Sequence, residues 1–203
     1  MKKLKLLIIT GPSGSGKTRL SNLLFKNLNN AFVLSTDNYY KTGFTSKVLA
    51  TFIKAYFDKP ISFNKKLIRK DIKTILKDKK LSHFYKYDFI KQKRLKFYKE
   101  FSEIDYLIIE GIFALEILEY LEKQNYILIR IKSNKRDCRE RACKRDYIER
   151  GKKQNKSFKD FKNAWEIYKI KEKTFKLNQL KELFYFTRSS DIKKILKLLS
   201  TNI

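Results

Sequence analysis

The sequence predicts an α/β fold in which a five-stranded parallel sheet lies between layers of helices. Short apolar runs of strand length alternate with helical patterns along the chain, which is typical of a parallel sheet with crossover helices. Two of these runs, residues 106–110 and 126–131, are continuously apolar, as expected of strands buried on both faces. A glycine-rich loop joins the first apolar run directly to the first helical pattern.

The core elements follow in chain order. The predicted strands are residues 4–10, 31–36, 106–110, 126–131 and 183–187. The predicted helices are residues 17–28, 65–76 and 192–199, the last with Ser190 or Asp191 as its N-cap. Residues 84–89 and 94–97 are expected to form a hairpin. With the helix 65–76, this hairpin predicts an inserted lobe at about residues 41–100, over the sheet edge where ligands bind in such folds.

Length and composition favour one domain that spans residues 1–203. No apolar run approaches the roughly 18 to 20 residues of a membrane-spanning helix, so we expect no membrane insertion. The first apolar stretch is too short for a signal peptide and runs into the glycine loop, which favours a cytoplasmic protein. Two cysteines and one histidine exclude a disulfide framework and a histidine-rich metal cluster.

The chain is strongly basic, with 48 lysines and arginines against 21 acidic residues and a formal charge of +27. A field of this sign attracts polyanions. However, 38 of the basic residues are lysines spread along the chain, and only ten are arginines, the residue favoured for bidentate recognition of phosphate and guanine. Charge alone therefore does not predict a nucleic-acid protein, and we expect no specific nucleic-acid partner.

Residues 11–18 match the phosphate-binding pattern G-x-x-x-x-G-K-[ST], between a predicted strand and a predicted helix. Glycines in such a loop let several backbone N–H groups point at one anion near the positive end of the helix. Lys17 would reach the β- and γ-phosphates, and the Thr18 hydroxyl would bind Mg²⁺. The motif predicts the three-layer fold of P-loop NTPases, with a nucleotide-phosphate site formed by Gly11, Pro12, Ser13, Gly14, Ser15, Gly16, Lys17 and Thr18.

Asp37 comes directly after the second predicted strand. A carboxylate at this strand end would face the γ-phosphate across the cleft, where it can accept the proton of an attacking hydroxyl group. The alternative for Asp37 is an ordinary helix or turn cap. For the neighbouring Tyr39 and Tyr40, the alternative to a site role is packing.

An ordered set of short motifs over roughly residues 4–153 resembles the uridine kinase family. Besides the phosphate loop, these motifs are Ser35-Thr36-Asp37-Asn38-Tyr39-Tyr40-Lys41, Tyr56-Phe57-Asp58-Lys59-Pro60 with Phe63, Tyr87-Asp88-Phe89, Ile108-Ile109-Glu110-Gly111-Ile112-Phe113 and Arg145-Asp146-Tyr147-Ile148-Glu149-Arg150-Gly151. They occur in that family's order and at similar spacings. The resemblance implies a kinase with a nucleoside acceptor and Mg·ATP as phosphate donor.

The resemblance also implies roles for individual residues. Asp37 would be the catalytic base, and Tyr40 would line the nucleoside pocket. Asp58 would accept hydrogen bonds from the ribose hydroxyls, with Phe57 and Tyr87 packed around sugar and base. Glu110 would help to hold hydrated Mg²⁺; its alternative is a capping or structural carboxylate.

The segment from residue 132 to 153 carries ten basic and four acidic residues. For Lys135, Arg136 and Arg139 we favour a solvated helix with i,i+4 ion pairs. For Arg145 and Arg150 the resemblance favours a lid that closes on ATP, neutralises charge on the transferred phosphoryl group and excludes water.

Two positions depart from the family pattern, both on the acceptor side. Gln92 stands where uridine kinases commonly carry a histidine that reads the pyrimidine; glutamine can still donate and accept at a base edge. Family members tend to have two adjacent arginines in the lid helix, whereas this chain has Arg141-Ala142, so Arg141 would contact the acceptor and the second contact is missing. This pattern indicates a kinase with altered substrate preference.

The sequence therefore favours a kinase that phosphorylates the 5′-hydroxyl of uridine or cytidine, in pyrimidine salvage. One alternative is a related kinase with another acceptor, such as nicotinamide riboside, pantothenate, glycerate or a pentose phosphate. Another is an RNA-binding P-loop protein with little turnover, although a base beside the phosphate loop argues against it. The oligomeric state stays open; kinases of the resembled family often form tetramers, so a homo-oligomer is one option.

Overall fold

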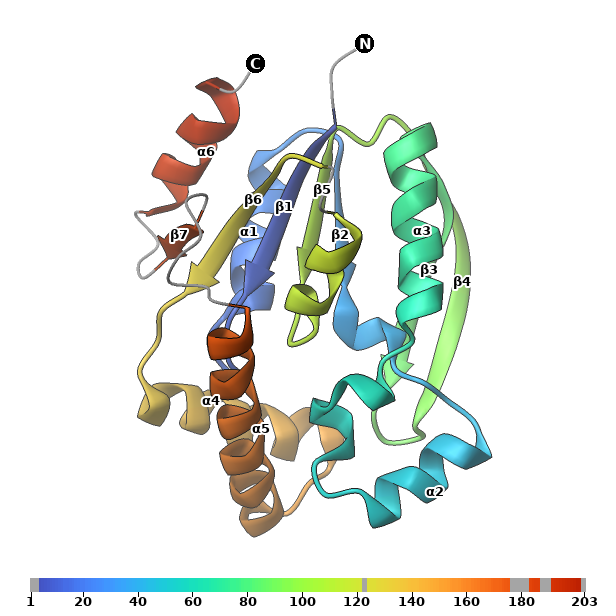
Figure 1. The fold of residues 1–203 in the computed structure, drawn as a ribbon, viewed down its shortest axis with the longest axis vertical. Helices are drawn as coiled ribbons and strands as arrows, with labels where there is room; N and C mark the ends of the chain where they lie inside the picture. The colour runs from blue at the N-terminus through green and yellow to red at the C-terminus, as the bar shows by residue number, and fades with distance from the viewer. Residues whose placement is uncertain (1–3, 122–123, 176–182, 187–190, 202–203) are drawn as a thin grey trace.

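The computed structural model describes residues 4–121, 124–175, 183–186 and 191–201. Its central sheet has five strands, all paired in parallel, in the order β2-β5-β1-β6-β7 (Figure 1). These strands are β1 (Lys5–Thr10), β2 (Ala31–Ser35), β5 (Tyr106–Glu110), β6 (Tyr126–Ile131) and β7 (Leu183–Phe186). The predicted five-stranded parallel sheet is confirmed, with strand limits within one residue of the predicted ones.

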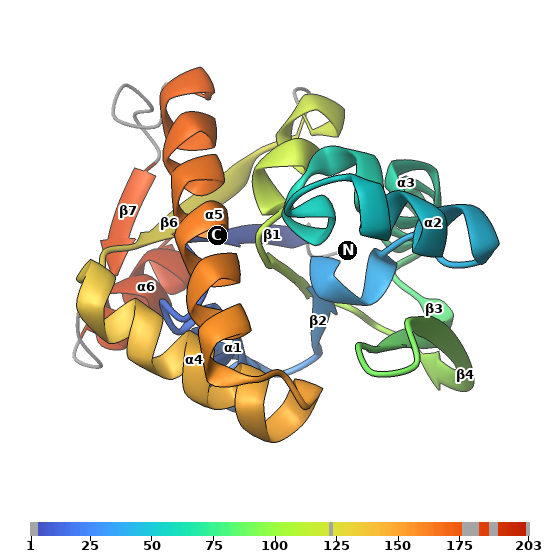
Figure 2. The same cartoon turned by 90° about the horizontal axis from the view of Figure 1, so that it is seen from below.

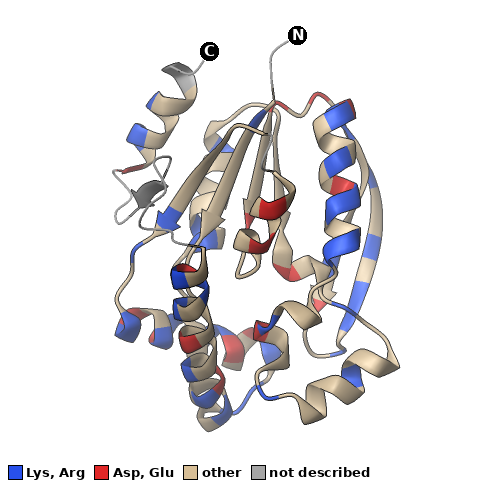
Figure 3. Cartoon of the chain, in the orientation of Figure 1, with Lys and Arg blue, Asp and Glu red and all other residues tan. Residues whose placement is uncertain are grey.

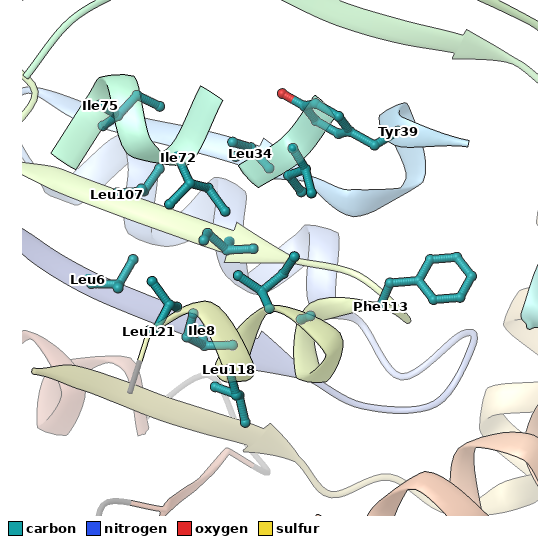
Figure 4. Close-up of a cluster of buried hydrophobic side chains, with 14 of the residues drawn as sticks. Leu6, Ile8, Leu34, Tyr39, Ile72, Ile75, Leu107, Phe113, Leu118 and Leu121 are labelled. Carbon is teal, nitrogen blue, oxygen red and sulfur yellow. The ribbon is translucent and has the colours of Figure 1, made fainter. Parts of the chain in front are cut away.

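The alternation of side chains along β1 assigns its residues to two separate cores. Leu7 and Ile9 point to the face covered by α1 (Lys17–Asn27) and α6 (Asp191–Thr201), where they form one buried cluster. Leu6 and Ile8 point to the opposite face, covered by α3 (Lys65–Asp78) and the 3₁₀ segment η4 (Ala114–Tyr120). Figure 4 shows this second cluster between β1, β5 and the covering helices. The sheet is thus buried on both faces, as continuously apolar strands require.

The chain between β2 and β5 forms the inserted lobe. It contains α2 (Phe44–Phe52), two short 3₁₀ turns, α3 and a two-stranded antiparallel hairpin. The turns are η2 (Tyr56–Asp58) and η3 (Pro60–Ser62), and the hairpin strands are β3 (Leu81–Asp88) and β4 (Lys93–Phe101). The predicted hairpin and α3 are both present and longer than expected. The sequence analysis did not predict α2, because its apolar residues form no buried stripe: only Ser46 on this helix is buried.

Two long helices follow β6 and pack against each other, below the carboxyl ends of the strands in the view of Figure 1; Figure 2 shows them from that side. They are α4 (Lys135–Arg150) and α5 (Gln154–Thr174). Their contact is a small apolar cluster around Cys138, Ala142 and Phe161. Cys138 and Cys143 are free thiols, in agreement with the expected absence of a disulfide framework.

Two predicted positions at the C-terminal end, Thr187 and the N-cap candidate Ser190, lie outside the described residues, and α6 begins at Asp191. Across the described part of the chain, no helix has the length and apolar character needed to cross a bilayer.

Candidate active site

The parallel register brings three predicted site residues to one edge of the sheet. In β5, Glu110 is paired with Ile9 of β1 on one side and with Ser35 of β2 on the other. The phosphate loop follows β1, and the 3₁₀ turn η1 (Thr36–Tyr39), which carries Asp37, follows β2 directly. The sheet itself therefore gathers Lys17, Asp37 and Glu110, which are far apart in the sequence.

Lys17 is buried at the start of α1, and its ammonium group donates 3.0 Å hydrogen bonds to the carbonyls of Gly11 and Pro12. Burial lowers the pKa of Lys17, while the nearby carboxylates of Glu110 and Asp37 act in the opposite direction. The amino group thus lies inside the curve of the loop, against two carboxylates. This is the position from which a lysine can reach a phosphate bound by the loop amides.

The backbone conformation at position 14 and the close approach of α4 both require a glycine there. Its φ of +76° lies in the left-handed region, and a Cβ atom there would lie 2.1 Å from the backbone oxygen of Cys138 in α4. The phosphate loop and α4 are therefore in backbone contact at this glycine. The Ser15 hydroxyl is buried in the same loop without a hydrogen-bond partner among the described residues. An unpartnered polar atom in a glycine cradle fits a phosphate group that would complete it.

Glu110 is 3% exposed, and the nearby hydroxyl groups of Ser35 and Thr18 act to lower the pKa of its carboxyl group. Burial and the neighbouring Asp37 raise its pKa, and Lys17 opposes this shift. A hydroxyl and a carboxylate side by side match the few protein ligands that Mg²⁺ takes when phosphates and waters complete its shell. Among the described residues there is no cluster of three or more His, Cys, Asp or Glu side chains that would bind a metal ion without such help.

Asp37 lies between the phosphate loop and the inserted lobe. Its Oδ1 atom is buried and accepts no hydrogen bond from any described residue. The same carboxylate raises the pKa values of Lys17 and Glu110 on one side and of Tyr40 and Asp58 on the other. No side-chain hydrogen bond caps the η1 turn, so the buried and unpartnered oxygen favours a reactive group over a cap.

A cavity of about 740 Å³ opens between the inserted lobe and helices α4 and α5; Ser13 of the phosphate loop lines it, whereas Asp37 is not among its lining residues. Five of the six residues predicted to bind the acceptor line it, namely Tyr40, Phe57, Asp58, Tyr87 and Gln92. The Tyr40 ring is buried, with ring centroids 5.5 Å from Phe57 and 5.0 Å from Tyr87. The aromatic side chains therefore both pack together and form the wall of the cavity.

Asp58 is the carboxylate within this aromatic wall. Burial raises its pKa to about 7; Lys152 and Arg150 lower it, whereas Asp160 and Asp37 raise it further. Lys152 and Asp160 also line the cavity and form an ion pair of 2.9 Å with each other. The sequence analysis missed this pair, and the signal that could have found it is weak, because isolated charges on a lysine-rich helix normally face solvent.

The predicted lid arginines converge on a third residue, Asp146. Arg145 and Arg150 contact its Oδ1 at 3.0 and 3.2 Å, and Lys152 contacts its Oδ2 at 3.3 Å. Although burial raises the pKa of Asp146, these three cations lower it below the ordinary value. Arg145 also donates to the Ser13 hydroxyl of the phosphate loop at 3.3 Å, which places its guanidinium group at the loop.

Gln92 and Arg141 occupy different surroundings. Gln92 has a positive φ of 51° in the turn of the β3–β4 hairpin and lines the cavity, where its side-chain amide can both donate and accept hydrogen bonds. Arg141 donates to the Gly14 carbonyl at 2.8 Å and to the Ser133 hydroxyl at 2.7 Å, so it contacts the phosphate loop. It is not among the residues that line the cavity; its neighbour Ala142 is.

The sequence model of the phosphoribulokinase/uridine kinase family matches residues 6–170 of the chain. The uridine kinase of Borrelia turicatae (strain 91E135) is 38% identical over 108 residues, which cover 53% of this chain and 51% of that protein. The uridine kinase of Staphylococcus aureus (strain JH9) is 35% identical over 121 residues, covering 57% of this chain and 56% of that protein. The chain thus spans about half the length of the curated relatives it matches.

Two solved structures share the architecture over most of their length. A possible uridine kinase from Bacillus stearothermophilus has a TM-score of 0.59 at 15% identity, over 91% of this chain and 90% of that one. The protein YFH7 of Saccharomyces cerevisiae has a TM-score of 0.62 at 10% identity, over 92% of this chain and 93% of that one. At such low identity these likenesses show a common P-loop kinase fold and nothing about the acceptor.

Proposed function

The chain belongs to the phosphoribulokinase/uridine kinase family, and on that premise we propose that it transfers the γ-phosphate of Mg·ATP to the 5′-hydroxyl of a pyrimidine nucleoside. Uridine and cytidine are the proposed acceptors, with UMP and CMP as products in pyrimidine salvage. The matched relatives are uridine kinases, which supports the reaction class. The fit of the phosphate loop, Thr18 and Glu110 to a nucleotide with Mg²⁺ supports the donor.

The position of Asp37 is the observation that carries this proposal. Its Oδ1 is buried and unpartnered, and the carboxylate raises the pKa values both of Lys17 at the phosphate loop and of Tyr40 in the cavity wall. An acceptor hydroxyl in the cavity would donate to this oxygen while its own oxygen faces the γ-phosphate. Asp37 then takes the hydroxyl proton as the oxygen attacks, which is the role of a general base in phosphoryl transfer.

The other site residues have supporting roles in the proposed reaction. Lys17 and the loop amides, from Gly11 to Thr18, hold the β- and γ-phosphates. Thr18 and Glu110 position hydrated Mg²⁺, which supplies charge neutralisation when bound. Arg145 and Arg150 balance the negative charge of the transferred group. We assign residues 132–153 to the lid and about residues 41–100 to the acceptor lobe, within one domain.

On the acceptor side, Asp58 would accept hydrogen bonds from the vicinal ribose hydroxyls. Tyr40, Phe57 and Tyr87 would enclose the sugar and the base, and Gln92 would contact the edge of the pyrimidine. Because Arg141 on α4 donates a hydrogen bond to the phosphate loop, we assign it to phosphate positioning in place of the acceptor contact that the sequence analysis expected.

One observation favours a second acceptor class. Lys47, Lys91 and Lys156 come from three different elements, line the cavity and are exposed. None of them forms an ion pair with a described carboxylate. Such a ring of cations suits an acceptor with its own anionic group, such as glycerate or a pentose phosphate.

The test is Mg²⁺-dependent ADP release with uridine, cytidine, nicotinamide riboside, pantothenate, glycerate and ribulose 5-phosphate. We expect turnover with a pyrimidine nucleoside, and a loss of about 10²- to 10⁴-fold in the Asp37→Asn protein because the general base is removed. ATP binding by Asp37→Asn should be retained. Turnover with an anionic acceptor alone would overturn the nucleoside assignment, and full activity of Asp37→Asn would overturn the assigned base.

A further inference from the structure

Asp71 is a buried carboxylate that the proposed reaction does not use. It lies on the inner side of α3, whose other charged residues are mostly lysines and arginines (Figure 3), and it is 2% exposed. Its Oδ2 atom accepts a 2.7 Å hydrogen bond from the Tyr39 hydroxyl, and its Oδ1 atom lies 3.3 Å from Nε2 of His83 in β3. A buried carboxylate is costly unless its oxygens have partners. Here the partners come from two other elements, so Asp71 joins η1, α3 and the hairpin.

The surroundings of this contact favour one arrangement of the hydrogen bond. Tyr39 is 3% exposed, and its burial and the Asp71 carboxylate both raise its pKa, so the hydroxyl group keeps its proton and acts as the donor. Burial raises the pKa of Asp71 as well, while Tyr39 and His83 act in the opposite direction. The rings of Tyr39 and His83 both meet the Tyr85 ring edge-on, with centroids 5.4 and 5.0 Å away. In such low-dielectric surroundings a hydrogen bond is stronger than in water, and its loss leaves a buried polar group without a partner.

Tyr39 is the last residue of the 3₁₀ turn η1, which also carries Asp37. Its side chain reaches from this turn toward α3 (Figure 4). The turn has four residues, so a rotation that moves Tyr39 away from α3 would move Asp37 as well. The Oδ1 atom of Asp37 has no hydrogen-bond partner among the described residues, and its place therefore depends on the backbone of the turn. The hydrogen bond between Tyr39 and Asp71 supports that backbone from outside the site.

The hairpin that supplies His83 is attached to the same part of the chain at two more points. The Asn38 side chain, in the turn, accepts a 3.1 Å hydrogen bond from the backbone N–H of Tyr87. Directly after the turn, the Tyr40 carbonyl accepts a 2.8 Å hydrogen bond from Arg94. Tyr87 and Tyr40 line the acceptor cavity. The hairpin thus contacts both the acceptor wall and the turn that carries the base, and the contact of His83 with its carboxylate partner ties these attachments to α3.

We propose that Asp71 is a positioning residue for the reaction, which through Tyr39 holds the general base Asp37 against the acceptor. His83 is the second partner of Asp71 and links it to the hairpin. This inference rests on the function proposed for Asp37. Apolar side chains at positions 39 and 71 could fill the same space, but a directional bond selects one orientation of the turn. Orientation matters because a displacement of about 1 Å at a reacting group can lower the rate about 10²-fold.

The first test compares two substitutions that each remove one hydroxyl group from the same aromatic cluster. Tyr39→Phe removes the hydrogen bond to Asp71, whereas the matched control Tyr85→Phe leaves it in place. With Mg·ATP and uridine, or the acceptor of the panel with the highest turnover, Tyr39→Phe should lower kcat about five- to tenfold, the effect of one hydrogen bond. The KM for ATP should stay within a factor of about two, and Tyr85→Phe should match the parent. Asp71→Asn can still accept from Tyr39 and should keep more of the activity than Asp71→Leu.

Double-mutant cycles separate positioning from a general structural role. In the Asp37→Asn protein the base is absent, so the addition of Tyr39→Phe should change kcat by less than a factor of about two. Urea unfolding tests the contact without the reaction. Tyr39→Phe should lower the unfolding midpoint of the parent but not that of the Asp71→Leu protein, in which the hydrogen bond is already lost.

Three results would overturn the positioning role alone. An equal fall in kcat when Tyr39→Phe is added to the parent and to Asp37→Asn would indicate a structural role. Equal losses of unfolding midpoint in the parent and in Asp71→Leu would mean that the two side chains do not stabilise each other. The third result is a parent-like kcat for Tyr39→Phe while activity is still lost in Asp37→Asn. Full activity of Asp37→Asn, in contrast, would overturn the proposed base itself and the inference with it.

Discussion

On the phosphate side of the candidate site, Lys17, Asp37 and Glu110 follow or end three neighbouring strands of one sheet. On the acceptor side, Asp58 comes from a 3₁₀ turn and Gln92 from a hairpin turn. Asp160 and Phe161, which line the same cavity, come from α5. The first arrangement is fixed by strand register, where a shift of one residue would turn every side chain to the other face. The second depends on side-chain packing and ion pairs. Chemistry shared by a family can therefore stay fixed while the acceptor wall changes.

The largest expected effect lies on the phosphate side. Lys17→Met should lower kcat/KM by about 10³-fold, because it removes a buried cation that would stabilise the transferred phosphoryl group. Lys26→Gln, near the end of the same helix, serves as the control for charge and should leave kcat/KM within a factor of two. Initial rates at several ATP concentrations measure both variants. If Lys17→Met kept most of the activity, the phosphate side would not hold the reacting group as proposed.

A second substitution tests the contact between the phosphate loop and α4. Gly14→Ala should lower the free energy of unfolding by about 3 kcal/mol, because its Cβ would collide with the Cys138 carbonyl as well as adopt a left-handed φ. Gly151→Ala has a similar φ of +61° with no atom within 4 Å of the added Cβ, so it should cost only about 1 kcal/mol. Denaturant unfolding compares the two. Equal losses would show that α4 yields freely and that the contact is not rigid.

The smallest effect concerns the acceptor side and depends on pH. With an Asp58 pKa of about 7, the carboxylate that we propose accepts the ribose hydroxyls is mostly protonated at pH 6 and mostly ionised at pH 8. The KM for the nucleoside should therefore be about tenfold higher at pH 6 than at pH 8, in proportion to the ionised fraction. Asp58→Asn should remove this dependence while the KM for ATP stays unchanged.

The Asp160→Asn variant tests the electrostatic explanation of this pH dependence. Asp160 raises the pKa of Asp58, so its removal should favour the ionised form and lower the nucleoside KM at pH 6 by about two- to threefold. At pH 8, where Asp58 is already ionised, the variant should match the parent. An equal change at both pH values would indicate direct contact between Asp160 and the acceptor and would contradict the electrostatic explanation.

The raised pKa of Asp58 also makes the stability of the folded protein depend on pH, with a definite sign. Because folding raises the pKa of Asp58 above 3.8, the folded state binds this proton more tightly than the unfolded state does. The resulting contribution to stability is fully present below about pH 4 and is lost as the pH rises through about 7.

The parts of the molecule that could be predicted are those with a local or periodic signal. The strands were predictable because burial on both faces makes them continuously apolar, and the loop because backbone wrapping around an anion requires glycines. Helix α2 was not predictable, since its apolar residues form no buried stripe; Phe44 and Phe52 are over 80% exposed. Asp146 lies within a motif that was noticed, but its contact with three cations depends on the end of α4 and the turn after Gly151, which spacing alone does not reveal.

The ion pairs of Asp146 have a consequence for the energetics of the lid. Arg145 and Arg150 share the single carboxylate of Asp146 with Lys152, so a phosphoryl group would have to compete with Asp146 for them. Binding is then an exchange of one anion for another, and its free energy is the difference between two ion pairs. With the role proposed for Arg145 and Arg150, such a lid would bind phosphate less tightly than two unpaired arginines would. When the product leaves, Asp146 would again pair with the two arginines, so no pair of like charges would be left without a counter-ion. This favours release of the product over its tight binding.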